Sequence, residues 1–419
     1  MESPRFLSAE ATRQLREQFG TPLYVYDEAT LRRQAESALA FPNPFGLTVR
    51  YAMKASPNAV ILRLFDSCGL HFDASSVHEV DRLLRAGVPA EKISLSTQEL
   101  PDSFPKYIEQ GVSLNASSII QLERFGERFP GGRVGLRFNP GRGSGHSNRT
   151  NVGGRSSSFG IWHEKTGIVQ EIVARYRLTA FRIHTHIGSG SDPAVWEHVA
   201  DLNLKMLRHF PAVSVLNMGG GYKIARMPGE TATELAAAGR KISAGLTALA
   251  DETGRRIHLE IEPGTYLVAN AGAVVSTIQD VTDTGSSGRA FLKLDCGMTE
   301  ILRPALYGSQ HPLTLVPAGD TNRQERHFYT VVGHCCESGD ILTPAPGEPE
   351  MVADLELPQA HIGDLMVIDG AGAYCSAMAT GNYNSFPLAP EVLRRTDGQF
   401  DLIRKRQSLD QLLANEIPI

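Results

Sequence analysis

Residues 47–65 read LTVRYAMKASPNAVILRLF and contain the pattern on which most of the chain is built. Apolar side chains at Leu47, Val49 and Tyr51 alternate as in a β-strand, a Ser-Pro-Asn turn follows, and a helix-period segment comes next. Lys54 lies between the strand pattern and the turn, as expected at the carboxyl end of a barrel strand, where barrel enzymes keep their chemistry. A solvated surface lysine is the ordinary alternative. A lysine within an apolar strand pattern is instead expected to be desolvated, with its amine free to form a Schiff base.

The same unit recurs along the first two thirds of the chain, and one helix-period segment separates most of the strands. The β-type runs begin at Leu47, Leu70, Lys92, Gly111, Arg133, Ala180, Val213 and Ile257. Eight strands alternating with helices predict an α/β fold of the (β/α)8 barrel class. An open doubly wound sheet is the weaker alternative, because no early strand ends in a glycine-rich dinucleotide-binding turn.

From about Tyr266 the pattern changes to strand after strand. The runs YLVANAGAVVSTIQDV, AFLKLDCG and HFYTVVGHC follow one another without helical segments, which predicts a mainly antiparallel β-domain. The YVYD strand at residues 24–27 is a candidate to join that domain. The predicted domains are therefore a barrel at 28–275 and a β-rich domain made of 1–27 and 276–419.

Composition limits the class of protein. The 419 residues are 42% hydrophobic and 21% charged, with a formal net charge of −5, so neither nucleic acid nor a membrane is an expected partner. The N-terminal residues do not have the pattern of a secretory signal, and we expect a cytoplasmic protein. The five cysteines have no CxxC spacing, which argues against a zinc ribbon or a disulfide framework and predicts reduced, mostly buried thiols.

One long loop follows the fifth predicted strand. Residues 140–160 read PGRGSGHSNRTNVGGRSSSFG, and a loop of this length is either functional or disordered. Because it leaves the strand end at which a barrel has its active site, we interpret it as a lid carrying Arg142, Arg149 and Arg155 rather than as a passive linker.

Three further motifs stand at predicted strand ends. NMGGGY at 217–222 allows backbone N–H groups to approach an anion closely, although glycine runs also serve simple turns. HTHIGSGSD places His184 and His186 on one face of a strand, and IEPG places Glu262 where a carboxylate can keep a pyridine nitrogen protonated. Each motif alone has an ordinary structural explanation. Together with Lys54 they describe a pocket for pyridoxal 5′-phosphate, a phosphorylated aldehyde.

These motifs resemble those of the alanine-racemase-fold pyridoxal phosphate decarboxylases, and most closely those of the diaminopimelate decarboxylases. The matching segments span essentially the whole chain: YAMKASPN, FDASSVHE, HTHIGSG, NMGGG, IEPG, RPALYGS, CCESGD and GAYCSAMATGNYN. The resemblance implies decarboxylation of meso-2,6-diaminopimelate to L-lysine and CO₂, the last step of lysine biosynthesis. It also implies a homodimer in which CESGD enters the active site of the partner subunit.

The resemblance assigns a role to each matched residue. Lys54 is the Schiff-base lysine, His186 stacks on the cofactor ring, and Glu262 pairs with the ring nitrogen. The remaining implied cofactor contacts are Asp73, Ser189, Gly219, Gly220, Gly221, Gly264 and Tyr374. Glu79 matches a second acidic position beside the cofactor, and the implied substrate contacts are Arg303, Tyr307, Glu337 and Tyr374. Cys336 matches the proton donor, and no metal is implied.

The chemistry expected from the residues agrees with these roles. Loss of CO₂ leaves a carbanion that the cofactor delocalises, and a positioned acid must then protonate the carbon. Cys336 is the expected acid, with Lys54 as the alternative. Because neighbouring strand residues face opposite ways, only one of Cys335 and Cys336 is expected to serve the pocket, and the other is expected to be structural.

The departures from the family pattern concern the substrate. EPGT stands where the family commonly has EPGR. Thr265 therefore replaces an arginine that would contact phosphate or a substrate carboxylate. Another loop arginine is a candidate to substitute for it. His334 stands where proline is usual, and a glycine precedes NYN. These changes fit either variation among diaminopimelate decarboxylases or a shift to a related amino acid such as D-ornithine, D-lysine or L-ornithine.

Two other classes of protein were weighed. The HxH pair is compatible with a metal-dependent barrel hydrolase, although no second histidine cluster at a strand end completes a site. A catalytically inactive homologue that binds another protein would be expected to have lost Lys54, Cys336 or the glycine turn, and all three are present.

Overall fold

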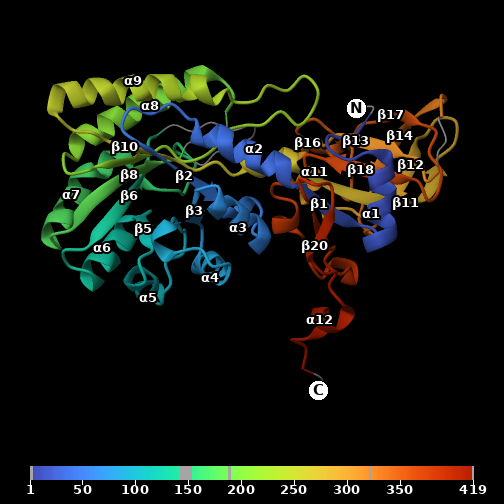
Figure 1. The fold of residues 1–419 in the computed structure, drawn as a ribbon, viewed down its shortest axis with the longest axis horizontal. Helices are drawn as coiled ribbons and strands as arrows, with labels where there is room; N and C mark the ends of the chain where they lie inside the picture. The colour runs from blue at the N-terminus through green and yellow to red at the C-terminus, as the bar shows by residue number, and fades with distance from the viewer. Residues whose placement is uncertain (1–2, 142–152, 187–189, 320–322, 418–419) are drawn as a thin grey trace. The chain divides into compact units, whose positions relative to one another are not determined.

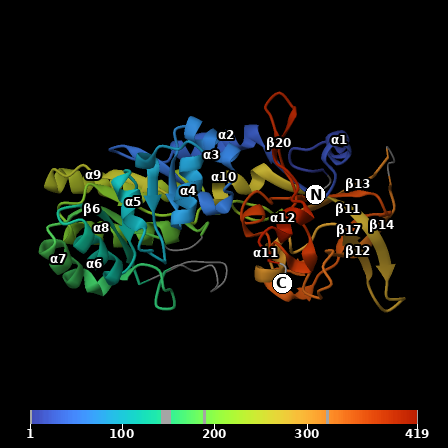
Figure 2. The same cartoon turned by 90° about the horizontal axis from the view of Figure 1, so that it is seen from below.

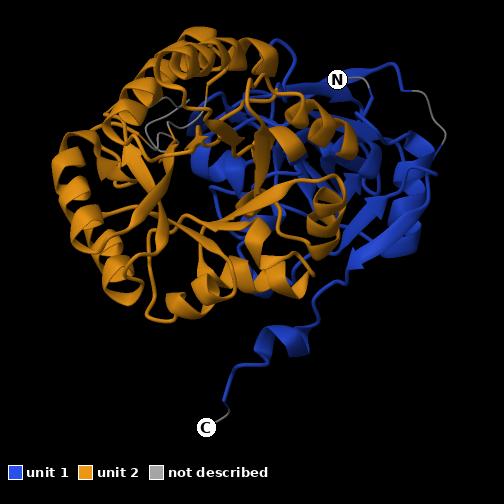
Figure 3. Cartoon of the chain, turned by 60° about the vertical axis from the view of Figure 1, so that its left-hand side comes forward, with its two compact units in different colours: residues 1–31, 225–230, 268–419 blue, residues 32–224, 231–267 orange. Residues whose placement is uncertain are grey.

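The computed structural model describes residues 3–141, 153–186, 190–319 and 323–417. The chain divides into two compact units (Figure 3). One unit comprises residues 32–224 and 231–267, and the other comprises 1–31, 225–230 and 268–419. The predicted domain ranges, 28–275 and 1–27 with 276–419, remain predictions. No helix in the described part of the chain is long and apolar enough to cross a membrane.

The first unit is a closed barrel of eight parallel strands, as predicted. Each strand pairs with its neighbours along the chain, and β2 closes the ring against β10. The strands are β2 (Leu47–Ala52), β3 (His71–Ala74), β4 (Ile93–Leu95), β5 (Ser113–Ala116), β6 (Arg133–Asn139), β8 (Thr179–Thr185), β9 (Val215–Asn217) and β10 (His258–Ile261). A two-residue strand, β7 (Ile161–Trp162), adds to the end of β6. All eight predicted β-type runs are therefore barrel strands.

Helices surround the barrel strands (Figures 1 and 3). They are α2 (Glu28–Leu39), α3 (Ala59–Ser67), α4 (Val77–Arg85), α5 (Phe104–Glu109), α6 (Ile119–Arg128), α7 (Thr166–Arg175), α8 (Pro193–His209), α9 (Leu235–Thr253) and the short α10 (Thr265–Val268). Asn58 caps α3 by accepting the backbone N–H of Val60, so the Ser-Pro-Asn turn also starts the next helix. The turn after Lys54 is thereby fixed by local sequence.

The barrel interior contains a layer of ionic side chains. Glu260 lies between two arginines: Arg50 Nη2 donates to its Oε1 at 2.9 Å, and Arg182 Nε lies 2.8 Å from its Oε2. Asn115 Oδ1 accepts from Arg182 Nη1 at 3.0 Å. Burial by itself would raise the pKa of Glu260, but Arg182 and Arg50 outweigh it and lower that pKa to about 2. The charge of Glu260 is therefore compensated within the chain by two arginines.

The second unit is built on a mixed, mainly antiparallel sheet, as predicted. Its strands are β1 (Leu23–Asp27), β11 (Gly272–Asp283), β12 (Ala290–Leu294), β13 (Leu313–Val316), β14 (Arg326–Val332), β17 (Leu355–Pro358), β18 (Leu365–Asp369), β19 (Glu391–Arg394) and β20 (Phe400–Arg404). The pair β15 (Pro344–Ala345) and β16 (Glu348–Val352) stands apart from this sheet. The helices are α1 (Ala9–Phe19), α11 (Leu302–Tyr307) and α12 (Leu409–Leu413). Figure 2 shows β11, β12, β14 and β17 side by side, in agreement with their pairing.

The N-terminal strand joins this sheet, as the sequence suggested. β1 pairs antiparallel with β11 and parallel with β19. Leu23 and Val25 on β1 are buried with Leu15 of α1, Val275 of β11 and Val367 of β18 in one apolar cluster. Burial of these side chains explains why a segment from the start of the chain folds with the C-terminal part.

Candidate active site

Lys54 lies at the carboxyl end of the first barrel strand. β2 ends at Ala52, and Lys54 occupies the single 3₁₀ turn at Met53–Ala55 that follows. The prediction of a desolvated lysine is wrong for this chain, because the side chain leaves the packed wall after the strand has ended and is exposed. An exposed primary amine at a barrel mouth is accessible to an aldehyde.

Glu262 follows the last barrel strand and is held on both carboxylate oxygens. Asn217 Nδ2 donates to Glu262 Oε1 at 2.7 Å, and His184 Nε2 lies 3.1 Å from Oε2. Asn217 Nδ2 also lies 3.1 Å from Oε2 of Glu260, which joins the mouth of the barrel to the ionic layer. Burial by itself would raise the pKa of Glu262, but His184 and Arg137 outweigh it and lower that pKa, so the carboxylate is ionised.

Asn217 also fixes the glycine turn. Its Oδ1 accepts the backbone N–H of Gly219 at 2.8 Å. A Cβ at Gly219 would lie 2.6 Å from the Thr185 carbonyl oxygen, and one at Gly220 would lie 2.2 Å from the Glu262 carbonyl oxygen. Glycine is therefore required here by the close approach of β8 and the segment after β10. Asn217 begins the NMGGGY motif, but its role was not predicted, because that role depends on contacts with β10 and the segment after it.

His186 lies against this turn. The backbone N–H of Gly220 approaches His186 Nδ1 at 3.5 Å, the long limit of a hydrogen bond. Burial lowers the pKa of His186 well below its ordinary value, and Arg137 and Lys54 add to the shift, so the imidazole is neutral. Ser189, the predicted phosphate contact, lies outside the described residues, as do Arg142 and Arg149 of the predicted lid.

Two charged residues at the strand ends complete the mouth. Asp73 is the next-to-last residue of β3 and accepts a hydrogen bond from Ser96 Oγ at 2.8 Å. Burial raises the pKa of Asp73 well above its ordinary value and Glu262 adds to the shift, although Lys54 opposes it. Arg137 on β6 is buried, and its charge acts on both Asp73 and Glu262. The sequence prediction missed Arg137, since an arginine between apolar residues of a strand gives no signal of its direction.

Two other predicted residues of the barrel have clear local roles. Glu79 Oε2 accepts the backbone N–H of Ser75 at 2.6 Å, which stabilises the start of α4. A Cβ at Gly264 would lie 3.3 Å from the Ala52 side chain and 3.4 Å from that of Ala55. Gly264 therefore lies beside the turn that carries Lys54.

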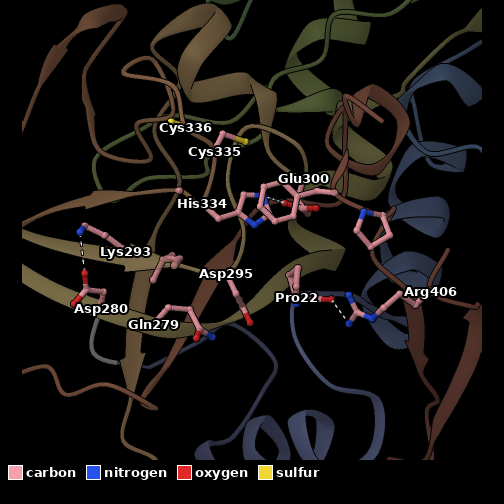
Figure 4. A pocket seen from close by; sticks show the side chains of 14 residues that line it. Pro22, Gln279, Asp280, Lys293, Asp295, Glu300, His334, Cys335, Cys336 and Arg406 are labelled. Carbon is pink, nitrogen blue, oxygen red and sulfur yellow. Dashed lines mark hydrogen bonds and ion pairs between the residues drawn. The ribbon is translucent and has the colours of Figure 1, made fainter. Parts of the chain in front are cut away.

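Cys335 and Cys336 differ in environment, but strand alternation is not the reason. β14 ends at Val332, so both cysteines follow the strand. Cys335 is buried and its N–H donates to Asp340 Oδ2 at 2.9 Å, whereas Cys336 is exposed and its N–H donates to Asn384 Oδ1 at 2.9 Å. Both cysteines line a cavity of about 570 Å³ within the second unit, shown in Figure 4 with His334 and Glu300.

The other predicted residues of the second unit also have defined contacts. Glu337 Oε2 accepts from the Tyr383 hydroxyl at 3.1 Å. Arg303 Nη2 donates to Ser309 Oγ at 3.2 Å, and Tyr307 ends the same short helix, α11. Tyr374 has φ 57°, a strained conformation for a bulky residue that is typical of functional positions.

The barrel mouth also contains three potential metal ligands. Ligand atoms of His184, His186 and Glu262 lie within 4.8 Å of one another. Both oxygens of Glu262 already have partners in His184 and Asn217, so a metal ion would have to break one of these contacts. The hypothesis of a metal-dependent hydrolase thus has a candidate set of ligands, but these side chains already form other interactions.

The groups at the mouth fit pyridoxal 5′-phosphate. An exposed amine, an ionised buried carboxylate, a neutral imidazole and a glycine turn stand at the carboxyl ends of β2, β10, β8 and β9. These groups match an aldehyde, a protonated pyridine nitrogen, an aromatic ring and a phosphate.

Comparison with known proteins identifies the class. The family model for the pyridoxal-binding domain of pyridoxal-dependent decarboxylases matches residues 28–269. The chain belongs to this family, and its cofactor is pyridoxal phosphate.

The similarity to named members extends from end to end. Diaminopimelate decarboxylase of Escherichia coli strain K12 is 36% identical over 98% of this chain and 97% of its own length. That of Streptomyces coelicolor is 36% identical over 100% of this chain and 92% of its own. A crystal structure of diaminopimelate decarboxylase superposes with a TM-score of 0.91 at 35% identity, covering 98% of this chain and 97% of that one. The predicted family resemblance is confirmed.

Proposed function

We propose that this protein decarboxylates meso-2,6-diaminopimelate to L-lysine and CO₂, the last step of lysine biosynthesis. The observation that carries the proposal is the end-to-end similarity to proteins named diaminopimelate decarboxylase, at 36% identity over 98% of the chain. The barrel mouth supplies the groups that this chemistry needs. When bound, pyridoxal phosphate accepts the electron pair left by the departing CO₂.

The residues of the barrel have separate tasks in this proposal. Lys54 would hold the cofactor through its aldehyde. Glu262, kept ionised by His184 and Asn217, holds a proton on the ring nitrogen. His186 would lie against the ring, and Gly219 to Gly221 would receive the phosphate. Because the Gly219 N–H already donates to Asn217 and the Gly220 N–H approaches His186, Gly221 is the better donor to that phosphate. The further proposed cofactor contacts are Asp73, Ser189, Gly264 and Tyr374.

The second unit is proposed to supply the acid and the substrate contacts. Cys336 gives a proton to the carbon that has lost CO₂, and its exposed thiol beside a backbone held by Asn384 supports this role. The proposed substrate contacts are Arg303, Tyr307, Glu337 and Tyr374. The barrel is proposed to be a domain at 28–275, with 1–27 and 276–419 forming the other.

The proposal includes a homodimer in the cytoplasm. The support for a dimer is the family resemblance, in which the CESGD loop serves the partner subunit. The support for a reducing compartment is that all five cysteines are free thiols.

The substrate is the point that most needs a test. CO₂ and product formation by the cofactor-loaded protein are measured on meso-diaminopimelate beside D-lysine, D-ornithine, L-ornithine and L-arginine. Selective formation of L-lysine from diaminopimelate is expected. Preference for one of the other amino acids would leave the fold and the cofactor in place, but would assign the protein to a related substrate and make Thr265 the first residue to examine.

A further inference from the structure

Cys336 lies on a loop, residues 333–337, that follows β14 and belongs to no helix or strand. The N–H of its neighbour Cys335 donates to Asp340 Oδ2 at 2.9 Å, so the loop is anchored on its buried side. Cys336 itself is exposed, and burial therefore does not fix the direction of its thiol. A group that gives a proton to one particular carbon needs a fixed position.

A second segment, NYNSF at residues 382–386, runs along the exposed side of this loop. Side-chain contacts join the two segments in antiparallel order: Phe386 with His334, Asn384 with Cys336, and Tyr383 with Glu337. The residue numbers rise along one segment as they fall along the other, although neither segment is a strand in this region. The loop is thus held along its length and not at a single point.

The outer contacts of this pairing set its register. The rings of Phe386 and His334 are stacked, with centroids 3.6 Å apart and an angle of 6° between their planes. His334 Nε2 also lies 2.6 Å from Thr299 Oγ1, which ties the ring to the body of the second unit. At the other end, the Tyr383 hydroxyl donates to Glu337 Oε2 at 3.1 Å.

The central contact is made by a residue with an unusual backbone. Asn384 has φ 48° and presents its Oδ1 to the Cys336 N–H at 2.9 Å. Its neighbours Asn382 and Ser385 also have left-handed conformations, with φ 76° and 58°. Such conformations cost free energy in residues that carry a Cβ, although asparagine tolerates them better than most. Several of them in one short segment are typical of a functional site.

We propose that Asn384 is the positioning residue for Cys336. By accepting the Cys336 N–H, it fixes the loop so that the exposed thiol points toward the carbon that receives its proton. His334, which stands where the family usually has proline, contributes by holding the other end of the segment through Phe386. This inference rests on the proposed function, because it concerns the role of acid that this function gives to Cys336.

Two substitutions of Asn384 provide the main test. Asn384→Gly tolerates the left-handed backbone but removes the acceptor, whereas Asn384→Asp keeps an oxygen at the same place. For Asn384→Gly, kcat on diaminopimelate is expected to fall by about 10- to 100-fold with KM nearly unchanged, because a misplaced group slows the chemical step without weakening binding. Asn384→Asp is expected to lose much less. Equal losses of kcat in both variants, or a change in KM alone, would overturn the proposal.

Asn382→Gly is the matched control. Asn382 belongs to the same segment and has the same kind of backbone conformation, and among the described residues its side chain forms no hydrogen bond with the loop. This variant is expected to keep the kcat of the wild type. If it loses as much as Asn384→Gly, the effect comes from a more flexible segment, and the role assigned to the Asn384 side chain is wrong.

A double variant tests whether Asn384 acts through the thiol. Cys336→Ala combined with Asn384→Gly is expected to have the same kcat as Cys336→Ala alone, because no thiol is left to position. A residue that only supports the fold would lower kcat by the same factor in both backgrounds. Multiplication of the two losses in the double variant would therefore contradict the proposal.

A measurement that does not depend on catalysis separates this inference from the proposed function. Hydrogen exchange at the Cys336 N–H is followed by mass spectrometry in the wild-type, Asn384→Gly and Asn384→Asp holoenzymes. Exchange is expected to be about 2- to 10-fold faster in Asn384→Gly, the range for one lost hydrogen bond, and unchanged in Asn384→Asp. Unchanged exchange in Asn384→Gly would overturn the proposal. If the wild type decarboxylates none of the amino acids tested, the proposed function is wrong, and the exchange rates alone then decide whether Asn384 holds the Cys336 backbone.

Discussion

Two buried glutamates of the barrel, one in the interior and one at the mouth, show how similar side chains can have different roles. Glu260 and Glu262 are two residues apart, each is 3% exposed, and Asn217 contacts both. Glu260 is neutralised by Arg50 and Arg182, whereas Glu262 at the mouth has a histidine and an amide as its direct partners. Glu260 is thus part of an ionic layer inside the barrel, whereas the negative charge of Glu262 is left for a ligand to match. Completeness of pairing, rather than burial, distinguishes the functional carboxylate.

The largest expected effect concerns the amine at the mouth. Lys54→Ala is expected to abolish decarboxylation and covalent attachment of the cofactor, because Lys54 supplies the primary amine in this proposal. Borohydride reduction followed by peptide mass spectrometry measures the attachment. Lys92→Ala, which removes a lysine paired with Asp66 at 2.6 Å, serves as the control and is expected to retain both properties. Cofactor still reduced onto the Lys54→Ala protein would refute the assignment.

Substitution of Glu260 is expected to lower mainly the stability of the protein, whereas substitution of Glu262 is expected to lower mainly its activity. Glu260→Gln leaves two buried arginines uncompensated, so the free energy of unfolding is expected to fall by about 3–5 kcal/mol. Glu262→Gln keeps the shape but loses the charge, so kcat is expected to fall by about 10²- to 10³-fold, with a change in stability of about 1 kcal/mol or less. Denaturant unfolding and steady-state kinetics on both variants measure the difference. A similar loss of stability in both would contradict the distinction drawn between the two layers.

Cys335 and Cys336 allow the same comparison of stability with activity in the second unit. Cys336→Ala is expected to lower turnover by about 10²-fold through loss of the proton donor, with the cofactor retained. Cys335→Ala removes the buried thiol and is expected to affect stability more than turnover. A thiol reagent applied to the native protein should label Cys336 first, since it alone among the cysteines is exposed. Unchanged kinetics for Cys336→Ala would transfer the role of acid to another group.

The smallest expected effect is a pH dependence at Glu300. Burial raises the pKa of Glu300 to about 7, although hydrogen bonds from Thr299 and Gly297 oppose the shift. The folded state therefore holds a proton that the unfolded state releases near the ordinary value, so this stabilisation is complete below about pH 4.5 and is lost as the pH rises through about 7. The free energy of unfolding of the wild type is expected to fall by about 2 kcal/mol between about pH 5 and pH 8 because of Glu300. Glu300→Gln is expected to abolish this part of the pH dependence. If the free energy of unfolding depends on pH in the same way in both proteins, Glu300 does not titrate in this range.

Much of the fold could be predicted because it depends on local patterns. The alternation of short apolar runs with helix-period segments identified all eight barrel strands, and Lys54 was placed correctly at a strand end. The exposure of Lys54 was missed, since the sequence does not show that β2 stops at Ala52. The reason given for the difference between Cys335 and Cys336 was wrong, because both lie beyond the strand, and which of them serves the active site stays a prediction.

The sequence by itself determined the class of fold, the order of the strands and the residue types at the strand ends, because periodicity and turn residues act over a few neighbouring positions. The tertiary structure decided which charges are compensated. Asn217 meets Glu260 and Glu262 from a neighbouring strand. Pairing depends on distances between segments that are brought together only by folding, and so the difference between a structural and a functional charge appears only in three dimensions.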